Sequence, residues 1–176
     1  PVLVRADGTY LYTLPSVVDD LEFGVTHIIR GEDHVTNTAT QIEIIEALDG
    51  KCPVFAHHPL LVMADGSALS KRLGSLSLES LREDDIDPMA INSLVSRLGT
   101  PDPVELRASL EEIAKDYDLT RLGRAPARFD PEELKRLNTK LLHDRAFEDV
   151  AEKLAALGVG GGAPFWDAVK GNIEHI

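Results

Sequence analysis

The pattern of the chain changes near its middle, and this change constrains the fold more than any other feature. Up to residue 63, short apolar runs typical of strands ("VTHIIRG" and "VFAHHPLLVM") alternate with segments of helical periodicity. From Ser77 onward only helical patterns follow. Because alternating strands and helices are typical of a sheet covered by helices, we predict an α/β fold that holds half of such a sheet, followed by an α-helical region.

The strand-like runs are bounded by turn signals. An Asp7-Gly8 pair inside "VLVRADGTYLYT" predicts a hairpin of two strands, because Asp-Gly tolerates the positive φ angles of a tight turn. "VTHIIRG" is typical of a short, fully buried strand that ends at Gly31. We expect "VFAHHPLLVM" to form the next strand and Asp65-Gly66 to form the turn after it.

Cap signals mark the predicted helices. The first is expected to end at Gly24, and Thr38 with Gln41 forms a capping-box pattern ahead of a helix that ends before Gly50. In the second half, Asp87-Pro88 and Asp130-Pro131 each predict a helix start, and a third helix closes at Gly158. "GVGGGAP" is typical of a flexible linker, after which "FWDAVKGNIEHI" predicts the first helix of a further part.

Composition excludes several classes of protein. The 176 residues include 30 Asp and Glu against 18 Lys and Arg, and the formal net charge of −12 confines any RNA contact to local basic patches. The only cysteine, Cys52, excludes an intramolecular disulfide and fits a reducing cytoplasm. No run approaches the roughly 20 apolar residues of a membrane span. Since the chain opens at Pro1 inside a strand-like run, we expect it to belong to a longer protein.

The segment "SALSKRLGS" combines groups that handle anions. Lys71 supplies a point charge, Ser70 a hydroxyl and Arg72 a second cation, with a glycine nearby that allows movement. A cation that meets a phosphoryl group only in the transition state lowers the barrier to its transfer. The alternative is a solvated basic turn, which is the more common identity of a Lys-Arg pair.

The segment "HIIRGEDH" is a second candidate. Arg30 follows a predicted strand, at the edge where ligands bind in open α/β sheets, and its guanidinium can hold a carboxylate with two hydrogen bonds. The acidic residues after it, including Asp33, can accept from ribose hydroxyls or an ammonium group. A surface Arg-Asp pair is an equally good interpretation. Four histidines lie in the first half of the chain, at His27, His34, His57 and His58. They lack the spacing of metal ligands, so no protein-bound metal is predicted.

Basic residues gather between residues 121 and 145, where they give a net positive charge inside an acidic chain. Such a local basic face is what contact with a phosphate backbone requires. A solvated helix face of mixed charge is the more common alternative.

Taken together, "DGTYLYTLPSVVDDLEFGVTHIIRGEDHVTNTATQ", "FAHHPLL", "LSKR" and "FDPEELKRLNTKLL" resemble, in order and separation, the glutamyl-tRNA synthetases of class I. The resemblance implies an α/β fold, the C-terminal half of a Rossmann-type nucleotide-binding domain, followed by an α-helical stem-contact domain. It implies boundaries at 1–75 for the second half of the catalytic domain with its KMSKR-type loop, and at 76–157 for the stem-contact region. Residues 158–176 then form a linker and the start of a truncated anticodon-binding domain.

The resemblance also assigns roles to residues. It implies catalysis by Lys71, Ser70 and Arg72; ATP binding by Lys71, Leu61, Leu69 and Asp33; glutamate binding by Tyr12, Arg30 and Ser16; and tRNA binding by Arg128, Lys135, Arg136 and Lys140. Two positions depart from the family pattern. Ala68 replaces the first lysine of the signature loop, and Ser16 stands where relatives often carry an asparagine.

The implied activity is ATP-dependent attachment of L-glutamate to tRNA through glutamyl-adenylate, with ATP and Mg2+ as the substrate complex. We expect a cytoplasmic, monomeric enzyme with no membrane contact, of which the fragment alone is inactive. One alternative is the glutamyl-queuosine-type paralogue, which attaches glutamate to a modified base of tRNA. Another is a non-catalytic RNA-binding or adaptor fragment.

Overall fold

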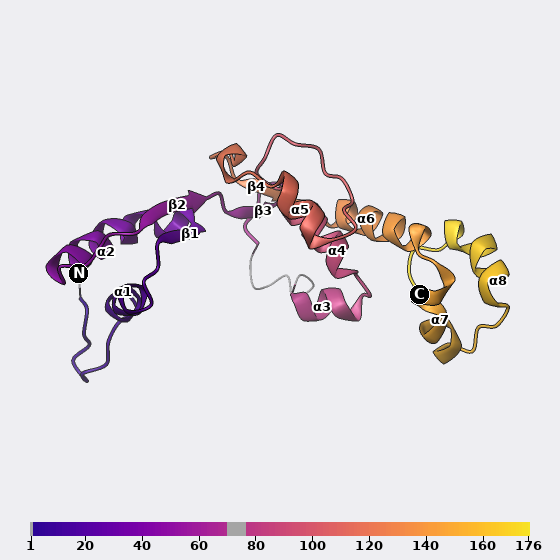
Figure 1. Cartoon of the computed structure of the whole chain (residues 1–176), viewed down its shortest axis with the longest axis horizontal. Coiled ribbons are helices and arrows are strands. Elements are labelled where there is room, and N and C mark those ends of the chain that lie inside the picture. The colour runs from indigo at the N-terminus through magenta and orange to yellow at the C-terminus, as the bar shows by residue number, and fades with distance from the viewer. Residues whose placement is uncertain (1, 70–76) are drawn as a thin grey trace. The chain divides into compact units, whose positions relative to one another are not determined.

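The structure, a computed structural model, describes residues 2–69 and 77–176 (Figure 1). It divides into two compact units, the first formed by Pro1–Leu60 with Gly123–Ala125 and the second by Leu61–Leu122 with Pro126–Ile176. The predicted catalytic residues Ser70, Lys71 and Arg72 lie outside the described residues.

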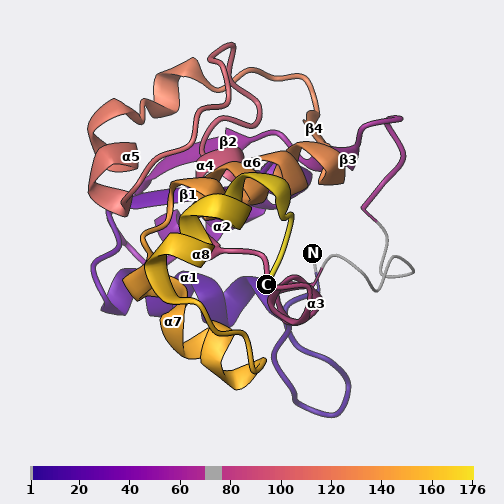
Figure 2. The same cartoon turned by 90° about the vertical axis from the view of Figure 1, so that its right-hand side faces the viewer.

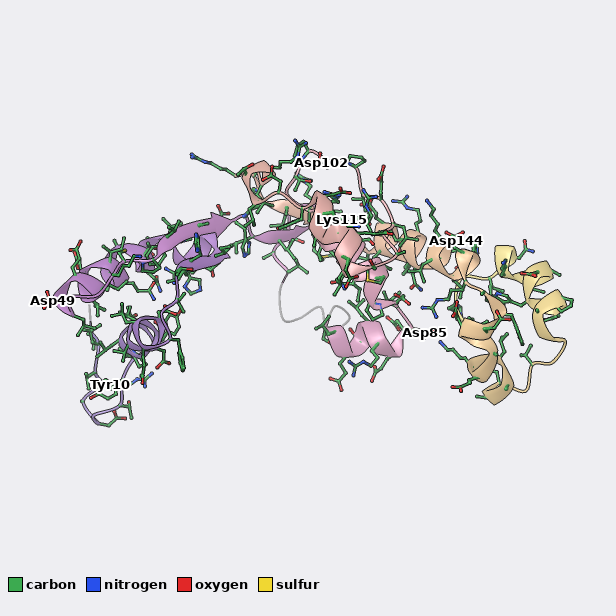
Figure 3. The ribbon with its side chains drawn as sticks, viewed as in Figure 1. Tyr10, Asp49, Asp85, Asp102, Lys115 and Asp144 are labelled. Carbon is green, nitrogen blue, oxygen red and sulfur yellow. The ribbon has the colours of Figure 1, made fainter. Side chains whose placement is uncertain are left out.

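The N-terminal segment turns where the sequence predicts, but it does not form two strands. Gly8 adopts a φ of 85° and its N–H donates to the carbonyl of Arg5, while a single antiparallel bridge joins Val4 to Tyr10. Tyr10 lies beside this turn with 63% of its surface exposed (Figure 3). The two-strand prediction is therefore wrong, because a hairpin gains little stability when no further element covers it.

The first unit is built on a parallel β–α–β crossover. Strand β1 (His27–Gly31) pairs with β2 (Val54–His58), with His27 opposite Val54 and Arg30 opposite His57. The 3-10 helix η1 (Glu32–His34) and helix α2 (Val35–Ala47) connect the two strands (Figure 1). This arrangement confirms the predicted α/β fold and places η1 directly at the carboxyl end of β1.

Strand β1 is less buried than predicted. Its side chains alternate between exposed and half-buried, and Ile29 is 48% exposed. In the described residues the β1–β2 sheet has only these two strands. The fully buried strand predicted from "VTHIIRG" is thus wrong for this chain.

Helix α1 (Thr13–Glu22) packs against α2. Val17 of α1 and Ile45 of α2 are each 1% exposed. As predicted, Gly24 follows α1 with a φ of 66°, in the left-handed conformation that favours glycine. The two helices therefore form the core of the first unit, and α2 is joined to both strands through Thr38 and Gln41.

The second unit contains a strand pair that the sequence did not predict. Strand β3 (Leu61–Met63) pairs in parallel with β4 (Ala127–Phe129). The predicted single strand over 54–63 is divided in two because Pro59, between β2 and β3, cannot donate a ladder hydrogen bond. The prediction that strands end before the helical half is also wrong, since a three-residue strand carries too short a pattern to detect.

The rest of the regular structure in this part of the second unit is helical. The helices are α3 (Leu78–Glu83), α4 (Pro88–Val95), α5 (Leu110–Asp116), the 3-10 helix η3 (Leu119–Arg121) and α6 (Pro131–Asp144). The predicted caps are confirmed: Asp87 accepts from the N–H of Met89, and Asp130 from that of Glu132. One core cluster joins Ala90 and Leu94 of α4, Phe129 of β4, and Leu134 and Leu137 of α6.

The last helices share a second cluster. Leu142 of α6, Val150 and Leu154 of α7 (Phe147–Ala156) and Trp166 of α8 (Gly162–Val169) are buried together. Helices α7 and α8 lie against each other (Figure 2). Trp166 is fully buried and its indole N–H donates to the carbonyl of Arg145 at 3.0 Å. The glycine-rich run predicted as a linker includes the first turn of α8, and η4 (Lys170–Asn172) follows that helix.

Candidate functional site

Arg30 is the centre of a polar network in the first unit. It stands next to last in β1, so its side chain lies at the carboxyl end of the sheet. Its Nη2 donates to Thr38 Oγ1 at 2.8 Å and to Gln41 Oε1 at 2.6 Å, and its guanidinium carbon lies 5.4 Å from the ring centre of Phe55 on β2. Both strands and α2 thus position one guanidinium.

Thr38 and Gln41 act differently from the prediction. The helix begins at Val35, so Thr38 lies inside it and the capping-box interpretation is wrong. Thr38 Oγ1 instead donates to the carbonyl of His34, accepts from Arg30 and lies 3.0 Å from Nε2 of His57. Residues three apart lie on the same face of a helix. Thr38 and Gln41 therefore both accept hydrogen bonds from Arg30 on one face of α2.

The charge of Arg30 has no acidic partner in this network. Among the described residues, no carboxylate lies within 4.0 Å of its guanidinium, and its hydrogen bonds all go to neutral acceptors. Its Nε is buried and has no hydrogen-bond partner in the same part of the chain. A partly buried cation without a counter-charge is costly, so this site favours an anionic ligand.

Ser16 joins the network from α1, and Tyr12 lies near it just before that helix. Gln41 Nε2 donates to Ser16 Oγ at 3.1 Å, and Ser16 Oγ donates to the carbonyl of Thr13 at the same distance. Tyr12 precedes α1 by one residue, is 57% exposed, and its ring centre lies 6.2 Å from that of His34. Gln41 therefore links Arg30 to Ser16, and Tyr12 approaches this network through His34, whose carbonyl accepts from Arg30.

Asp33 lies beside this network in η1. Its carboxylate is 3.9 Å from Nε2 of His34, and its side chain is 56% exposed. A Cβ on Gly31 would stand 2.5 Å from Oδ1 of Asp33, so the carboxylate approaches the backbone closely at the end of β1. The tight turn after the strand therefore presents an accessible acid three residues after Arg30.

Leu61 and Leu69, predicted to bind ATP, belong to the second unit. Leu61 opens β3 opposite Ala127 and is 42% exposed. Leu69 is half-buried against the cluster of α4, β4 and α6. Between them, the Asp65-Gly66 turn forms as predicted, with Gly66 at a φ of 85° and the N–H of Ser67 donating to Asp65.

The four residues predicted to contact tRNA also lie in the second unit. Lys135, Arg136 and Lys140 are exposed on α6, whose other face carries Leu134 and Leu137 into the core. Lys135 is paired with Glu132 at 2.9 Å, which raises the pKa of the lysine. Arg128 on β4 donates to the carbonyl of Ala64 at 2.7 Å.

Other members of the predicted basic run serve the fold. Arg121 binds Asp102 through two hydrogen bonds, and Arg145 binds Asp87, the cap of α4. The first pair holds the pKa of Asp102 below its ordinary value. The basic surface is consequently smaller than the sequence run, since these cations are neutralised by acids elsewhere in the unit.

Several known proteins are similar to this chain in sequence and in fold. The family described as class I tRNA synthetases (E and Q), catalytic domain, matches residues 1–136. A glutamate–tRNA ligase of Maricaulis maris is 57% identical over the whole chain, which covers 40% of that protein, and one of Hyphomonas neptunium is 55% identical with the same coverage. The crystal structure of glutamate-tRNA synthetase from Elizabethkingia anophelis matches 99% of the chain, and 41% of its own, at 27% identity with a TM-score of 0.83.

The chain therefore belongs to the class I tRNA synthetases of the glutamate and glutamine group and contains part of their catalytic domain. It resembles glutamate–tRNA ligases in particular and spans about 40% of their length. Among the described residues, no helix is long and apolar enough to cross a membrane, and no group of three or more metal-binding side chains is found.

Proposed function

We propose that the chain is part of a glutamate–tRNA ligase, which forms glutamyl-adenylate from L-glutamate and ATP and transfers the glutamyl group to tRNA. The observation that carries the proposal is Arg30, a cation at the carboxyl end of a parallel strand whose described partners are all neutral. Such a guanidinium can hold a substrate carboxylate with charge-assisted hydrogen bonds. Glutamate supplies that anion.

The amino acid pocket lies in the first unit. Arg30 and Tyr12 contact glutamate, and Ser16 belongs to the same pocket. A crystal structure of a glutamate tRNA ligase from Elizabethkingia meningosepticum in complex with its amino acid, with a TM-score of 0.80 and 27% identity, supports an amino acid site in this fold. Asp33, which follows β1 in η1, is the residue of this unit that we propose contacts ATP.

ATP, accompanied by Mg2+, binds Leu61, Leu69 and Lys71, and Lys71 with Ser70 and Arg72 stabilises charge on the phosphates. The sequence "LSKR" and its match to the signature loop of the family support these roles. In adenylate formation the glutamate carboxylate attacks the α-phosphorus and pyrophosphate leaves. The enzyme contributes mainly by positioning the substrates and neutralising charge.

We propose that tRNA lies against α6 and β4 through Arg128, Lys135, Arg136 and Lys140. Three of these side chains lie on the exposed face of an otherwise well-packed helix, as a phosphate-binding surface requires. We propose that the C-terminal half of a Rossmann-type domain covers residues 1–75 and that the stem-contact region covers residues 76–157. Residues 158–176 then form a linker and the start of an anticodon-binding domain. The complete ligase acts in the cytoplasm as a monomer, and the fragment alone is inactive.

Pyrophosphate exchange tests the proposal. The full-length protein, supplied with glutamate, ATP and tRNA, is expected to exchange pyrophosphate into ATP, and Lys71→Ala is expected to abolish the exchange. Loss on substitution establishes adenylate chemistry at this loop. No exchange by the wild type, or exchange indifferent to Lys71, contradicts the proposal and favours an adaptor role.

A second experiment separates the ligase from the paralogue that modifies a base. After charging with labelled glutamate, the terminal adenosine of the tRNA is removed. We expect the label to leave with the adenosine. Label that stays with the rest of the tRNA identifies the base-modifying paralogue.

A further inference from the structure

The network around Arg30 is a directional chain of hydrogen bonds. Arg30 Nη2 donates to Gln41 Oε1, Gln41 Nε2 donates to Ser16 Oγ, and Ser16 Oγ donates to the carbonyl of Thr13. The three distances are 2.6, 3.1 and 3.1 Å. Each group donates to the next one, so the chain links β1, α2 and α1.

The orientation of the Gln41 amide follows from its partners. Arginine has only donors, so Arg30 requires the oxygen of the amide, and the nitrogen must then face Ser16. Gln41 is 1% exposed, which means that packing holds the amide in this orientation. The edge of the guanidinium that carries Nη2 is fixed toward α2 in turn. All the hydrogen bonds that Arg30 makes to described residues use Nη2.

Ser16 has little capacity left for a substrate carboxylate. A hydroxyl has one hydrogen to donate and two lone pairs. The hydrogen is used on Thr13 and one lone pair accepts from Gln41. Carboxylates only accept hydrogen bonds, so Ser16 must lose its bond to Thr13 before it can bind one directly.

We propose that Gln41 is a positioning residue for the amino acid pocket, and that Ser16 acts on the substrate through Gln41 rather than by direct contact. Gln41 holds Nη2 of Arg30 against α2, so the remaining guanidinium donors face the substrate carboxylate in a fixed orientation. Ser16 holds the amide of Gln41. This inference rests on the proposed function, because the substrate carboxylate is that of glutamate.

A double-mutant cycle in the full-length enzyme tests the proposal. Pyrophosphate exchange gives KM for glutamate, KM for ATP and kcat for the wild type, Gln41→Met, Ser16→Ala and the double variant. Because hydrogen bonds to charged groups contribute about 1.5–3 kcal/mol, Gln41→Met is expected to raise KM for glutamate on the order of 10- to 100-fold. KM for ATP should change less than about twofold, because the proposed role of Gln41 concerns the amino acid pocket.

The double variant decides how Ser16 acts. If Ser16 works through Gln41, Ser16→Ala raises KM for glutamate by only about threefold and adds nothing to Gln41→Met. If the two effects multiply, Ser16 contacts the substrate directly and the proposal is wrong. An unchanged KM in Gln41→Met also overturns it.

Two further variants keep the test decisive if Gln41→Met does not fold. Gln41→Glu keeps an acceptor for Arg30 but sets a negative charge beside it, so KM for glutamate is expected to rise at least about tenfold with the fold intact. An unchanged KM in that variant contradicts the proposal even if Gln41→Met does not fold. Glu43→Gln, at an exposed position on the same helix, is the matched control and should behave as the wild type.

The readouts separate this inference from the proposed function. Absence of glutamate-dependent exchange in the wild type removes both. Normal exchange in the wild type together with unaltered kinetics in the Gln41 variants removes only the role of Gln41.

Discussion

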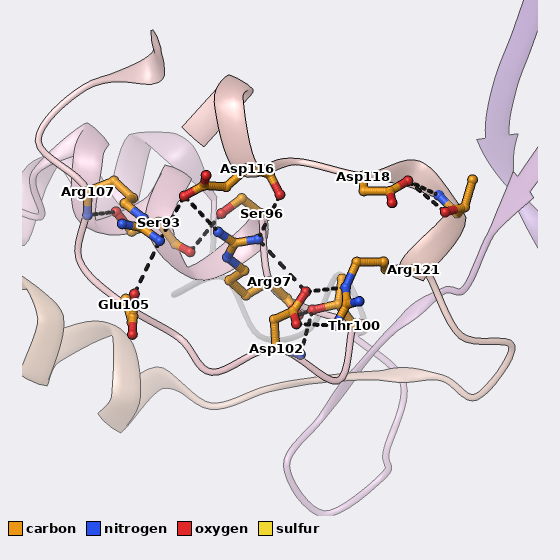
Figure 4. Close-up of polar contacts among 11 residues, drawn as sticks. Ser93, Ser96, Arg97, Thr100, Asp102, Glu105, Arg107, Asp116, Asp118 and Arg121 are labelled. Atoms are coloured by element: carbon orange, nitrogen blue, oxygen red, sulfur yellow. Dashed lines mark hydrogen bonds and ion pairs between the residues drawn. The ribbon is translucent and has the colours of Figure 1, made fainter. Parts of the chain in front are cut away.

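Two arginines of this chain occupy opposite electrostatic settings. Arg30, in the first unit, donates to Thr38 and Gln41 and has no carboxylate within 4.0 Å among the described residues. Arg97, in the second, is only 8% exposed and lies 4.0 Å from Asp102 and 3.9 Å from Asp116 (Figure 4). An arginine held by neutral groups keeps its charge for a ligand, whereas one enclosed by acids uses it to join segments of the fold.

The surroundings of Arg97 show what such joining achieves. Arg107 pairs with Glu105 and Asp116, and Arg121 pairs with Asp102, so three cations and three acids alternate around a cavity of about 290 Å3 (Figure 4). These residues connect the segment between α4 and α5 with α5 itself and with η3. The equal numbers of opposite charges leave no net charge for a ligand, in contrast to the site of Arg30.

The largest effect is expected where the charge of Arg30 is kept but its shape is changed. Arg30→Lys retains a cation, yet one ammonium cannot hold Thr38, Gln41 and a substrate carboxylate together. The loss of two charge-assisted hydrogen bonds, about 2 kcal/mol each, should lower kcat/KM for glutamate on the order of 1000-fold. Pyrophosphate exchange measures this ratio, and thermal unfolding is expected to change little. A near-normal ratio would mean that Arg30 does not bind the substrate.

Arg97→Met is the counterpart of that substitution and should affect stability instead. Removing the buried cation leaves two carboxylates partly unpaired, although Arg107 and Arg121 still compensate them. We expect the free energy of unfolding to fall by about 2–3 kcal/mol while kcat and KM of the folded enzyme stay unchanged. Urea unfolding and exchange kinetics on the same sample give both quantities. A selective rise in KM would show that the two arginines are not separated in function.

How far the sequence predicted the molecule depends on the range of each interaction. The caps at Asp87 and Asp130 are local, since each side chain accepts from an N–H two residues later, and both were predicted correctly. Strand β4 was missed because its partner β3 lies more than 60 residues earlier in the chain. Arg30 was placed at a strand end from the sequence, and the parallel pairing of β1 and β2 confirms that position.

The partners of Arg30 were not predictable in the same way. A Thr-x-x-Gln pattern has two physical meanings, a helix cap or a polar helix face, and only the observed start of α2 at Val35 decides between them. The basic run was overestimated for a related reason. The acids that neutralise Arg121 and Arg145 lie 19 and 58 residues away, outside any local count of charge.

A smaller effect is expected on α6, where cations with and without an acidic partner lie side by side. Among the described residues, Lys135 is paired with Glu132, and no ion pair involves Arg136 or Lys140. Arg136→Ala with Lys140→Ala should weaken tRNA binding on the order of tenfold and flatten its dependence on salt by about 1.5 in log–log slope. Lys135→Ala should weaken binding less. Filter-binding titrations at several salt concentrations measure both, and equal effects of all three residues would contradict the distinction.

The smallest effect concerns Asp102 and depends on pH. The hydrogen bond from Arg121, followed by the charges of Arg121 and Arg97, keeps the pKa of this carboxyl below its ordinary value. A group whose pKa is lower in the folded state contributes stability above its unfolded pKa of about 4, and loses that contribution as the pH falls through the folded value. Asp102→Asn should therefore be less stable than the wild type from neutral pH down to about pH 4, and the difference should disappear in more acidic solution. Urea unfolding at a series of pH values gives the difference, and a deficit that persists in acid would mean that Asp102 stabilises the fold by its shape and not by its charge.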